Sequence, residues 1–223
     1  MRIIEQFFSL LAPDECQVCE REGSLLCEDC AAETLIRLPE RCYRCYKQSE
    51  LSKTCQNCRK YSVLKYVWVG CEYNRSAKKL IYSLKFNFAK SAAKVIAREI
   101  AIALPALPED TVIVHIPAAT SHVRKRGFDQ SALVARELSL RLNLPHIHAL
   151  ARMGQQRQVG SKRAERLEQM KNAFRPVSGA IKHMNVLLVD DVLTTGSTLE
   201  SAALTLKKAS AKTIAAAVFA QAQ

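Results

Sequence analysis

The apolar positions of this chain fall into two kinds of pattern. Short continuous apolar runs occur at residues 111–116 (TVIVHI), 186–189 (VLLV) and 213–219 (TIAAAVF), and residues 61–73 also have strand character. Such runs are typical of strands buried on both faces of a parallel sheet. We therefore expect a buried strand at each position. His115 lies within the 111–116 run and is expected to be a core histidine.

Helical spacing separates these runs. Residues 75–86, 91–104, 129–142 and 198–209 place their apolar side chains three and four positions apart. Strands that alternate with helices predict an α/β fold with a parallel sheet.

The first residues do not resemble a targeting segment. Residues 3–12 predict a short helix, but only Arg2 precedes them, and polar residues interrupt the apolar stretch. No window approaches the ~20 apolar residues of a membrane span. We expect a cytoplasmic protein with no stable membrane insertion.

The strand pattern at 186–189 leads into the most informative stretch. Asp190 and Asp191 follow it, and then comes a loop of hydroxyls and one glycine: Thr194, Thr195, Gly196, Ser197 and Thr198. The first amides of a helix lack intrahelical partners and attract phosphate. Carboxylates at the carboxyl end of a strand can accept bonds from sugar hydroxyls or face a hydrated Mg²⁺. The layout predicts a site for a phosphorylated sugar.

A simpler interpretation concerns the same loop. Ser197 can cap the following helix, with Glu200 closing a capping box. We expect this box as well, although it does not explain two carboxylates directly after an apolar strand.

The stretch VLLVDDVLTTGSTL at 186–199 resembles the 5-phosphoribosyl-1-diphosphate (PRPP) signature of type I phosphoribosyltransferases. The resemblance implies a Rossmann-like sheet under a smaller hood. It also implies that Asp190 and Asp191 bind the ribose hydroxyls and that residues 194–198 cradle the 5-phosphate. It does not identify the acceptor.

The charge is unevenly distributed. The formal net charge is +12, yet residues 1–60 carry 9 Lys+Arg against 10 Asp+Glu. The positive charge therefore lies in the part that holds the phosphate loop. It fits a polyanionic ligand, either a diphosphate sugar or nucleic acid, although a solvated basic surface is the alternative.

Cysteines dominate the first part of the chain. They form four CxxC pairs: Cys16, Cys19, Cys27, Cys30, Cys42, Cys45, Cys55 and Cys58. Two such pairs complete one closed tetrahedral site, so we expect about two structural zinc ions. Sequential pairing is simplest, and spacing does not exclude an interleaved one. Disulfides are the alternative, against which a cytoplasmic location argues. Cys71 is expected to be an unligated core residue.

Two basic stretches are further candidates. Arg124, Lys125 and Arg126 precede Gly127 and can hold a diphosphate or a carboxylate, and Asp129 is predicted to cap the next helix. In and after residues 75–86, lysines alternate with aromatic residues: Lys78, Lys79, Lys85, Lys90, Tyr82, Phe86 and Phe88. Such a face can bind nucleic acid, although such aromatics are more often part of a core.

The multi-cysteine segment, KRGFDQ at 125–130 and the VDDVLTTGST loop together resemble the ComF/GntX family of competence-associated phosphoribosyltransferase-like proteins. The resemblance implies a zinc-ribbon hood in residues 1–60 and a phosphoribosyltransferase-like domain in residues 61–223. Asp129 departs from the family pattern, which usually has Asn there, and its role is left open.

The same resemblance implies which residues contact the leaving pyrophosphate. Ala118 and Ala119 would lie in the loop that meets the pyrophosphate. Residues 153–175 resemble a loop that folds over PRPP, with Arg157, Arg163 and Arg166 as candidates for a cation on the leaving group.

Two functions follow from this resemblance. One is transfer of a phosphoribosyl group from Mg²⁺–PRPP to an unidentified acceptor. The other is a non-catalytic PRPP sensor or single-stranded-DNA binder that works with other competence proteins in DNA uptake. Fold alone does not choose between them.

Overall fold

The computed structural model describes residues 13–87, 89–153, 173–177, 179 and 181–222. The helix predicted at residues 3–12 lies outside these residues.

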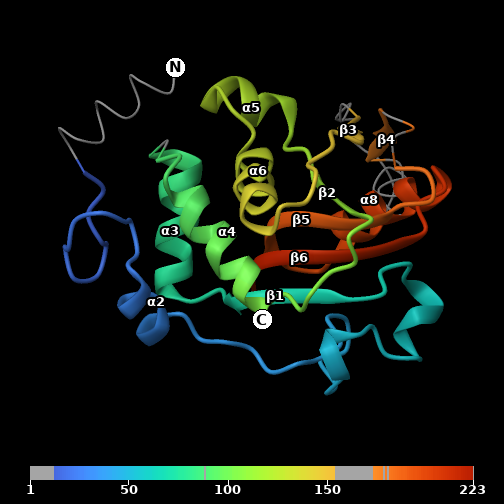
Figure 1. Cartoon of the computed structure of the whole chain (residues 1–223), viewed down its shortest axis with the longest axis horizontal. Helices are drawn as coiled ribbons and strands as arrows, with labels where there is room; N and C mark the ends of the chain where they lie inside the picture. The colour runs from blue at the N-terminus through green and yellow to red at the C-terminus, as the bar shows by residue number, and fades with distance from the viewer. Residues whose placement is uncertain (1–12, 88, 154–172, 178, 180, 223) are drawn as a thin grey trace, which may run out of the picture.

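A parallel sheet forms the centre of the molecule (Figure 1). In the described part of the chain it has four strands in the order β1-β6-β5-β2. These are β1 (Val67–Glu72), β2 (Thr111–His115), β5 (Asn185–Leu193) and β6 (Thr213–Gln221), and all neighbours run parallel. The predicted Rossmann-like sheet is confirmed. The first strand is shorter than the pattern at 61–73 suggested: η2 (Cys58–Tyr61) includes residue 61, and Tyr66 forms an isolated bridge with Lys53 instead of belonging to β1.

The strand that carries the acidic pair is longer than predicted. β5 does not end at Val189 but continues to Leu193, with Asp190 paired to Val218 and Val192 to Ala220 of β6. Both carboxylates therefore belong to the last residues of a hydrogen-bonded strand. The ladder fixes their backbone, which a free loop would not do.

Helices cover both faces of the sheet (Figure 1). On one face lie α3 (Arg75–Phe86), α4 (Ala92–Ala103) and α6 (Gln130–Leu142), close to their predicted bounds. Their apolar sides form one buried core with Leu187 and Val189 of β5. On the other face α8 (Ser197–Lys208) packs against Leu188 and its neighbours in a second core.

Three short elements were not predicted. α5 (Thr120–Arg126) ends at Gly127, which adopts a left-handed φ of 75°. β3 (Leu150–Arg152) and β4 (Phe174–Pro176) form an antiparallel pair beside α8. Elements of three residues are too short to show a period in the sequence.

The cysteine-rich segment packs on both faces of the sheet. It contains α2 (Glu28–Thr34) and the 3-10 turns η1 (Glu50–Ser52) and η2 (Cys58–Tyr61). Leu26 and Cys30 join the core under α3 and α4, whereas Tyr43 joins the core under α8. Between these points the chain follows the free edge of β1, where the Glu72 amide donates to the Ile36 carbonyl at 2.8 Å. The domain boundary at residue 60 stays a prediction.

Cys71 is fully buried in β1, as expected for a core residue outside the CxxC pairs. Among the described residues, no helix combines the length and apolar character needed to cross a membrane.

Candidate functional site

Asp190 and Asp191 are held by side chains from two helices. Asp190 Oδ1 accepts hydrogen bonds from the Ser131 hydroxyl of α6 at 3.1 Å and from the Asp191 amide at 2.9 Å. Asp191 is buried, and its Oδ2 lies 2.6 Å from Nζ of Lys85, on α3. The acidic pair is thus a fixed junction of β5, α3 and α6, and not a solvated pair.

The pKa of Asp190 departs from that of an ordinary aspartate. Burial raises the pKa of Asp190, and the neighbouring Asp191 charge raises it further, to about 7. Asp190 therefore holds its proton for part of the time near neutral pH in the ligand-free protein. It can act as a donor or an acceptor toward a ligand hydroxyl.

The loop after β5 leads directly into a helix N-terminus. Gly196 is the N-cap of α8 with φ 77°, a conformation that glycine adopts without strain. Thr194 and Thr195 are exposed, and the hydroxyls of Thr195 and Ser197 lie 3.0 Å apart. The loop therefore presents exposed hydroxyls beside the positive end of a twelve-residue helix.

The predicted capping box is wrong. The N-cap is Gly196 and not Ser197, so no hydroxyl stands at the cap position, and the Thr195 hydroxyl oxygen accepts from the Ser197 amide at 3.4 Å instead. The Glu200 carboxylate instead accepts bonds from the Tyr43 hydroxyl and from Arg44 Nη1, the latter at 3.1 Å. Contacts from a segment far away in sequence have taken the side chain that the local pattern assigned to the cap.

Tyr43 forms the floor of this loop. A Cβ atom built on Gly196 would lie only 2.9 Å from Cε2 of the Tyr43 ring. Tyr43 lies between the cysteines of the third CxxC pair, and its hydroxyl also lies 2.9 Å from the Ser62 hydroxyl. The second half of the cysteine segment therefore directly supports the candidate phosphate loop.

Asp129 connects the loop after β2 to α6. Its Oδ2 accepts from the Ala118 amide at 2.8 Å, and its Oδ1 accepts from the Ser131 and Ala132 amides at 3.0 and 3.3 Å. The predicted N-cap is confirmed. Because Ser131 also donates to Asp190, this one carboxylate organises both the Ala118–Ala119 loop and the acidic pair.

The predicted basic stretch lies in a short helix. Arg124, Lys125 and Arg126 form the last turn of α5, where cations stabilise the negative end of the helix. Arg126 donates to Gln130 at 2.9 Å, and its guanidinium lies 5.2 Å from the centre of the Phe86 ring.

A basic groove of about 1000 Å³ runs along α3 and reaches α5 and the start of α6. Its cations are Arg75, Lys78, Lys79, Lys85 and Arg126. Tyr82 and Phe86 also line it, are about half exposed, and have ring centres 4.9 Å apart. Lys85 belongs both to this groove and to the ion pair with Asp191, so the groove is continuous with the acidic pair.

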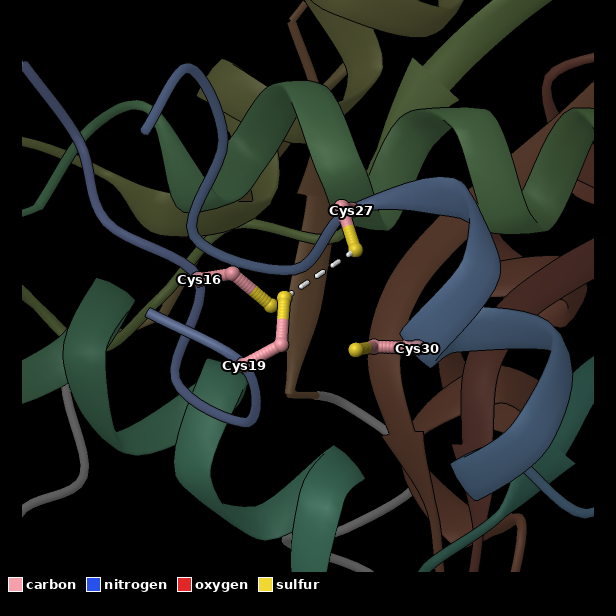
Figure 2. Close-up of side chains that lie close together, drawn as sticks. All are labelled: Cys16, Cys19, Cys27 and Cys30. Carbon is pink, nitrogen blue, oxygen red and sulfur yellow. Dashed lines mark hydrogen bonds between the residues drawn. The ribbon is translucent and has the colours of Figure 1, made fainter. Parts of the chain in front are cut away.

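The cysteines form two clusters with the simple sequential grouping. Cys16, Cys19, Cys27 and Cys30 point toward one centre (Figure 2), and Cys42, Cys45, Cys55 and Cys58 form the second cluster. In each cluster the sulfur atoms lie within 4.8 Å of one another. The sulfur atoms of Cys19 and Cys27 are 3.8 Å apart, and those of Cys45 and Cys55 are 3.6 Å apart. Tetrahedral zinc with Zn–S bonds of ~2.3 Å separates its sulfurs by about 3.8 Å, so both clusters fit structural zinc.

Three residues that support the candidate site were not predicted as part of it: Lys85, Ser131 and Tyr43. Lys85 was noted only as a nucleic-acid contact, and its position in the last turn of α3 gives no local sign that it pairs with Asp191. The other two act through contacts between distant segments, for which the sequence holds no local signal. Arg157, Arg163 and Arg166 lie outside the described residues, and their predicted role stays a prediction.

Comparison with known proteins identifies a matching domain family and two related competence proteins. Residues 123–223 match the phosphoribosyl transferase domain family. Competence protein ComFC of Streptococcus pneumoniae is 28% identical over 225 residues, which cover 96% of this chain and 93% of that protein. Competence protein ComFC of Bacillus subtilis is 30% identical over 129 residues, which cover 58% of this chain and 48% of that protein. The second match thus spans about half the length of that relative.

A solved structure of the allosteric regulatory enzyme of purine biosynthesis is also similar. The match has 18% sequence identity and a TM-score of 0.44, and it covers 58% of this chain and 25% of that one.

Proposed function

Because the chain belongs to the ComF family of phosphoribosyltransferase-like proteins, we propose that it binds PRPP at the Asp190–Thr198 segment and transfers the phosphoribosyl group to an acceptor nitrogen. The arrangement of the acidic pair and the loop carries this proposal. Two carboxylates, fixed by Lys85 and Ser131, stand immediately before a glycine-capped helix N-terminus.

Each part of PRPP has a matching group in this arrangement. The first turn of α8, with the hydroxyls of Thr194 to Thr198, would receive the 5-phosphate. Asp190 and Asp191 would bind the two ribose hydroxyls. The loop of Ala118 and Ala119, held by Asp129, would face the pyrophosphate. Arg124, Lys125 and Arg126 of α5 would contribute positive charge at that end.

In the reaction, the bond from C1 of the ribose to the pyrophosphate oxygen breaks, and a bond from C1 to the acceptor nitrogen forms. The pyrophosphate leaves with the electron pair, and the acceptor nitrogen loses a proton. Mg²⁺ bound to the substrate would neutralise charge on the leaving group. The residues of this chain position the ribose by its hydroxyls and phosphate, which holds C1 in reach of the acceptor.

We further propose that the two cysteine clusters hold about two structural zinc ions. Four thiolates complete the coordination of each ion and leave no open position for a substrate. Their role is to fix the segment that supports Gly196 through Tyr43.

A calorimetric titration with PRPP and Mg²⁺ tests the binding part. We expect the zinc-loaded native protein to bind, and Asp191→Asn to bind at least about tenfold more weakly, the equivalent of one lost hydrogen bond to a charged group. Asp110→Asn is the matched control, because Asp110 is half exposed and pairs with Lys212 and Asn185 away from the loop. Equal binding by native and Asp191→Asn protein would contradict the assignment. Pyrophosphate release, screened over candidate nitrogen acceptors, tests the transfer.

The basic groove favours a second candidate, single-stranded DNA. Exposed Tyr82 and Phe86 offer faces on which bases can stack, and the surrounding cations can bind phosphates. This activity fits the competence role that the names of the two ComFC relatives state for those proteins.

A salt titration separates DNA binding from PRPP binding. Affinity for an oligonucleotide should fall steeply as salt rises, and Tyr82→Ala with Phe86→Ala should lower it by about tenfold or more, since each stacked base contributes ~1–3 kcal/mol. PRPP binding should be unchanged in that variant. An oligonucleotide affinity that neither salt nor the variant alters would eliminate this candidate.

A further inference from the structure

Three histidine rings meet at the edge of the sheet formed by β2. His115 is the last residue of β2 and is buried, and His146 and His148 come from the segment between α6 and β3. The ring centres of the three lie 5.1, 4.7 and 5.0 Å apart. The apolar run around His115 predicts a core histidine, whereas no sequence pattern marks the other two.

The backbone explains why the rings converge. The Ile113 amide donates to the Pro145 carbonyl, and the Ile147 amide donates to the Ile113 carbonyl, so residues 145–147 run parallel to β2 as an added edge strand. Side chains two residues apart on such a strand point to the same face. His146 and His148 are two residues apart, and they lie beside His115, which shares a face with Ile113.

The nitrogens are close enough to bind one ion. One ring nitrogen from each histidine can be chosen so that all three lie within 4.8 Å of one another. His115 Nδ1 and His146 Nε2 are 2.9 Å apart. Three imidazoles on tetrahedral zinc, with Zn–N bonds of ~2.0–2.1 Å, have nitrogens roughly 3.3 Å apart. The separations in the structure, 2.9 Å for one pair and at most 4.8 Å for the others, bracket this value.

A hydrogen bond between His115 and His146 accounts for only two of the rings. It does not explain why His148 approaches both. The charged group that acts on His146 is Arg136, an exposed residue of α6 whose field water screens. A neutral imidazole ring offers one nitrogen lone pair to a metal, so each of the three rings can supply one ligand.

We propose that His115, His146 and His148 form a third metal site, distinct from the two cysteine clusters, that takes a borderline divalent transition ion such as Zn²⁺. Imidazole ligands suit zinc, copper and nickel better than magnesium or calcium. Three protein ligands leave the fourth position of a tetrahedral ion open, and the exposed His148 ring places the site at the protein surface. The ion would join the 145–148 segment to the end of β2 at His115, just before the loop that contains Ala118.

The test is a Co²⁺ titration of the full chain without a histidine tag, with its cysteine-bound zinc in place. We expect about one Co²⁺ per chain with visible bands of a nitrogen-ligated, four- or five-coordinate ion, and a shift of these bands on addition of azide. His146→Ala/His148→Ala should abolish the bands. The matched control is His122→Ala/His183→Ala, which removes two exposed histidines elsewhere and should leave the bands intact.

Three results would overturn the proposal. They are the absence of nitrogen-type cobalt bands in the native protein, bands of equal strength in His146→Ala/His148→Ala, and cobalt spectra that show only sulfur-to-cobalt charge transfer. If the double variant loses its native circular dichroism, His148→Ala alone decides the question. This residue is exposed, so its loss should spare the fold and weaken Co²⁺ binding by roughly tenfold or more.

Discussion

Replacing Asp190 by Asn should make the ligand-free protein more stable, and increasingly so as pH rises. The folded-state pKa of Asp190 is about 7, whereas its ordinary value is 3.8. Between these values the unfolded chain has released the proton that the native protein still holds. The native state therefore loses stability as pH rises through this window, and it loses no more above the folded pKa. Asn cannot ionise and is free of this loss.

The magnitude follows from the shift. Each pKa unit corresponds to about 1.36 kcal/mol, so the part of the window between pH 5.5 and 7 amounts to about 2 kcal/mol. The Asn side-chain oxygen can still accept from Ser131 and from the Asp191 amide, so the substitution keeps the bonds of the native carboxylate. We expect the advantage of Asp190→Asn over the native protein to grow by about 2 kcal/mol between pH 5.5 and 8.5.

Urea unfolding at pH 5.5, 7.0 and 8.5 with saturating zinc measures this difference. Asp191→Asn is the contrasting variant, because it leaves Lys85 without its carboxylate and should lower stability at pH 5.5. An advantage of Asp190→Asn that stays constant or shrinks with rising pH would refute the reasoning. The same substitution should weaken PRPP binding, so a gain in stability accompanied by a loss of binding is the expected combination.

Three further outcomes are expected. Lys85→Met should destabilise the protein by about 2–4 kcal/mol in urea unfolding because buried Asp191 loses its partner, whereas Lys94→Met, at an exposed position of α4, should change stability by less than about 0.5 kcal/mol. Gly196→Ala should cost about 1–3 kcal/mol, since φ 77° is strained for alanine and its Cβ meets Tyr43; an unchanged melting temperature would contradict this. After removal of loosely bound metal, elemental analysis should find about two zinc ions per chain, and a strong chelator should unfold the cysteine segment.

Most of the regular structure could be predicted from the sequence, because apolar periodicity decides it. Helix α3 has the predicted bounds, and α4, α6 and α8 begin or end within a residue of them. The end of β5 could not be predicted in the same way. The sequence pattern placed Asp190 and Asp191 after the strand, since polar residues seldom occupy a buried strand. Within the strand, Lys85 pairs with Asp191 and Ser131 donates to Asp190, which offsets the cost of burying the two carboxylates.

The candidate site was located from sequence, but its supports were not. The Asp190–Thr198 stretch carries its own signal, because phosphate loops have characteristic residues. Tyr43 and Glu200 lie 157 residues apart and make their contact only in the folded chain. The capping-box prediction used local sequence alone and therefore assigned Glu200 to the wrong partner.

Because Tyr43 contacts both the second cysteine cluster and the candidate phosphate loop, metal binding to that cluster and ordering of the loop are thermodynamically coupled. Its backbone joins the cysteines of the third CxxC pair, and its ring fills the space under Gly196. Suppose that an anion in the loop and a metal in the cluster both favour the same position of the Tyr43 ring. Each then raises the affinity of the protein for the other by the same factor. A ligand of the loop should then raise the zinc affinity of the Cys42 cluster and leave that of the Cys16 cluster, which packs on the opposite face of the sheet, unaffected.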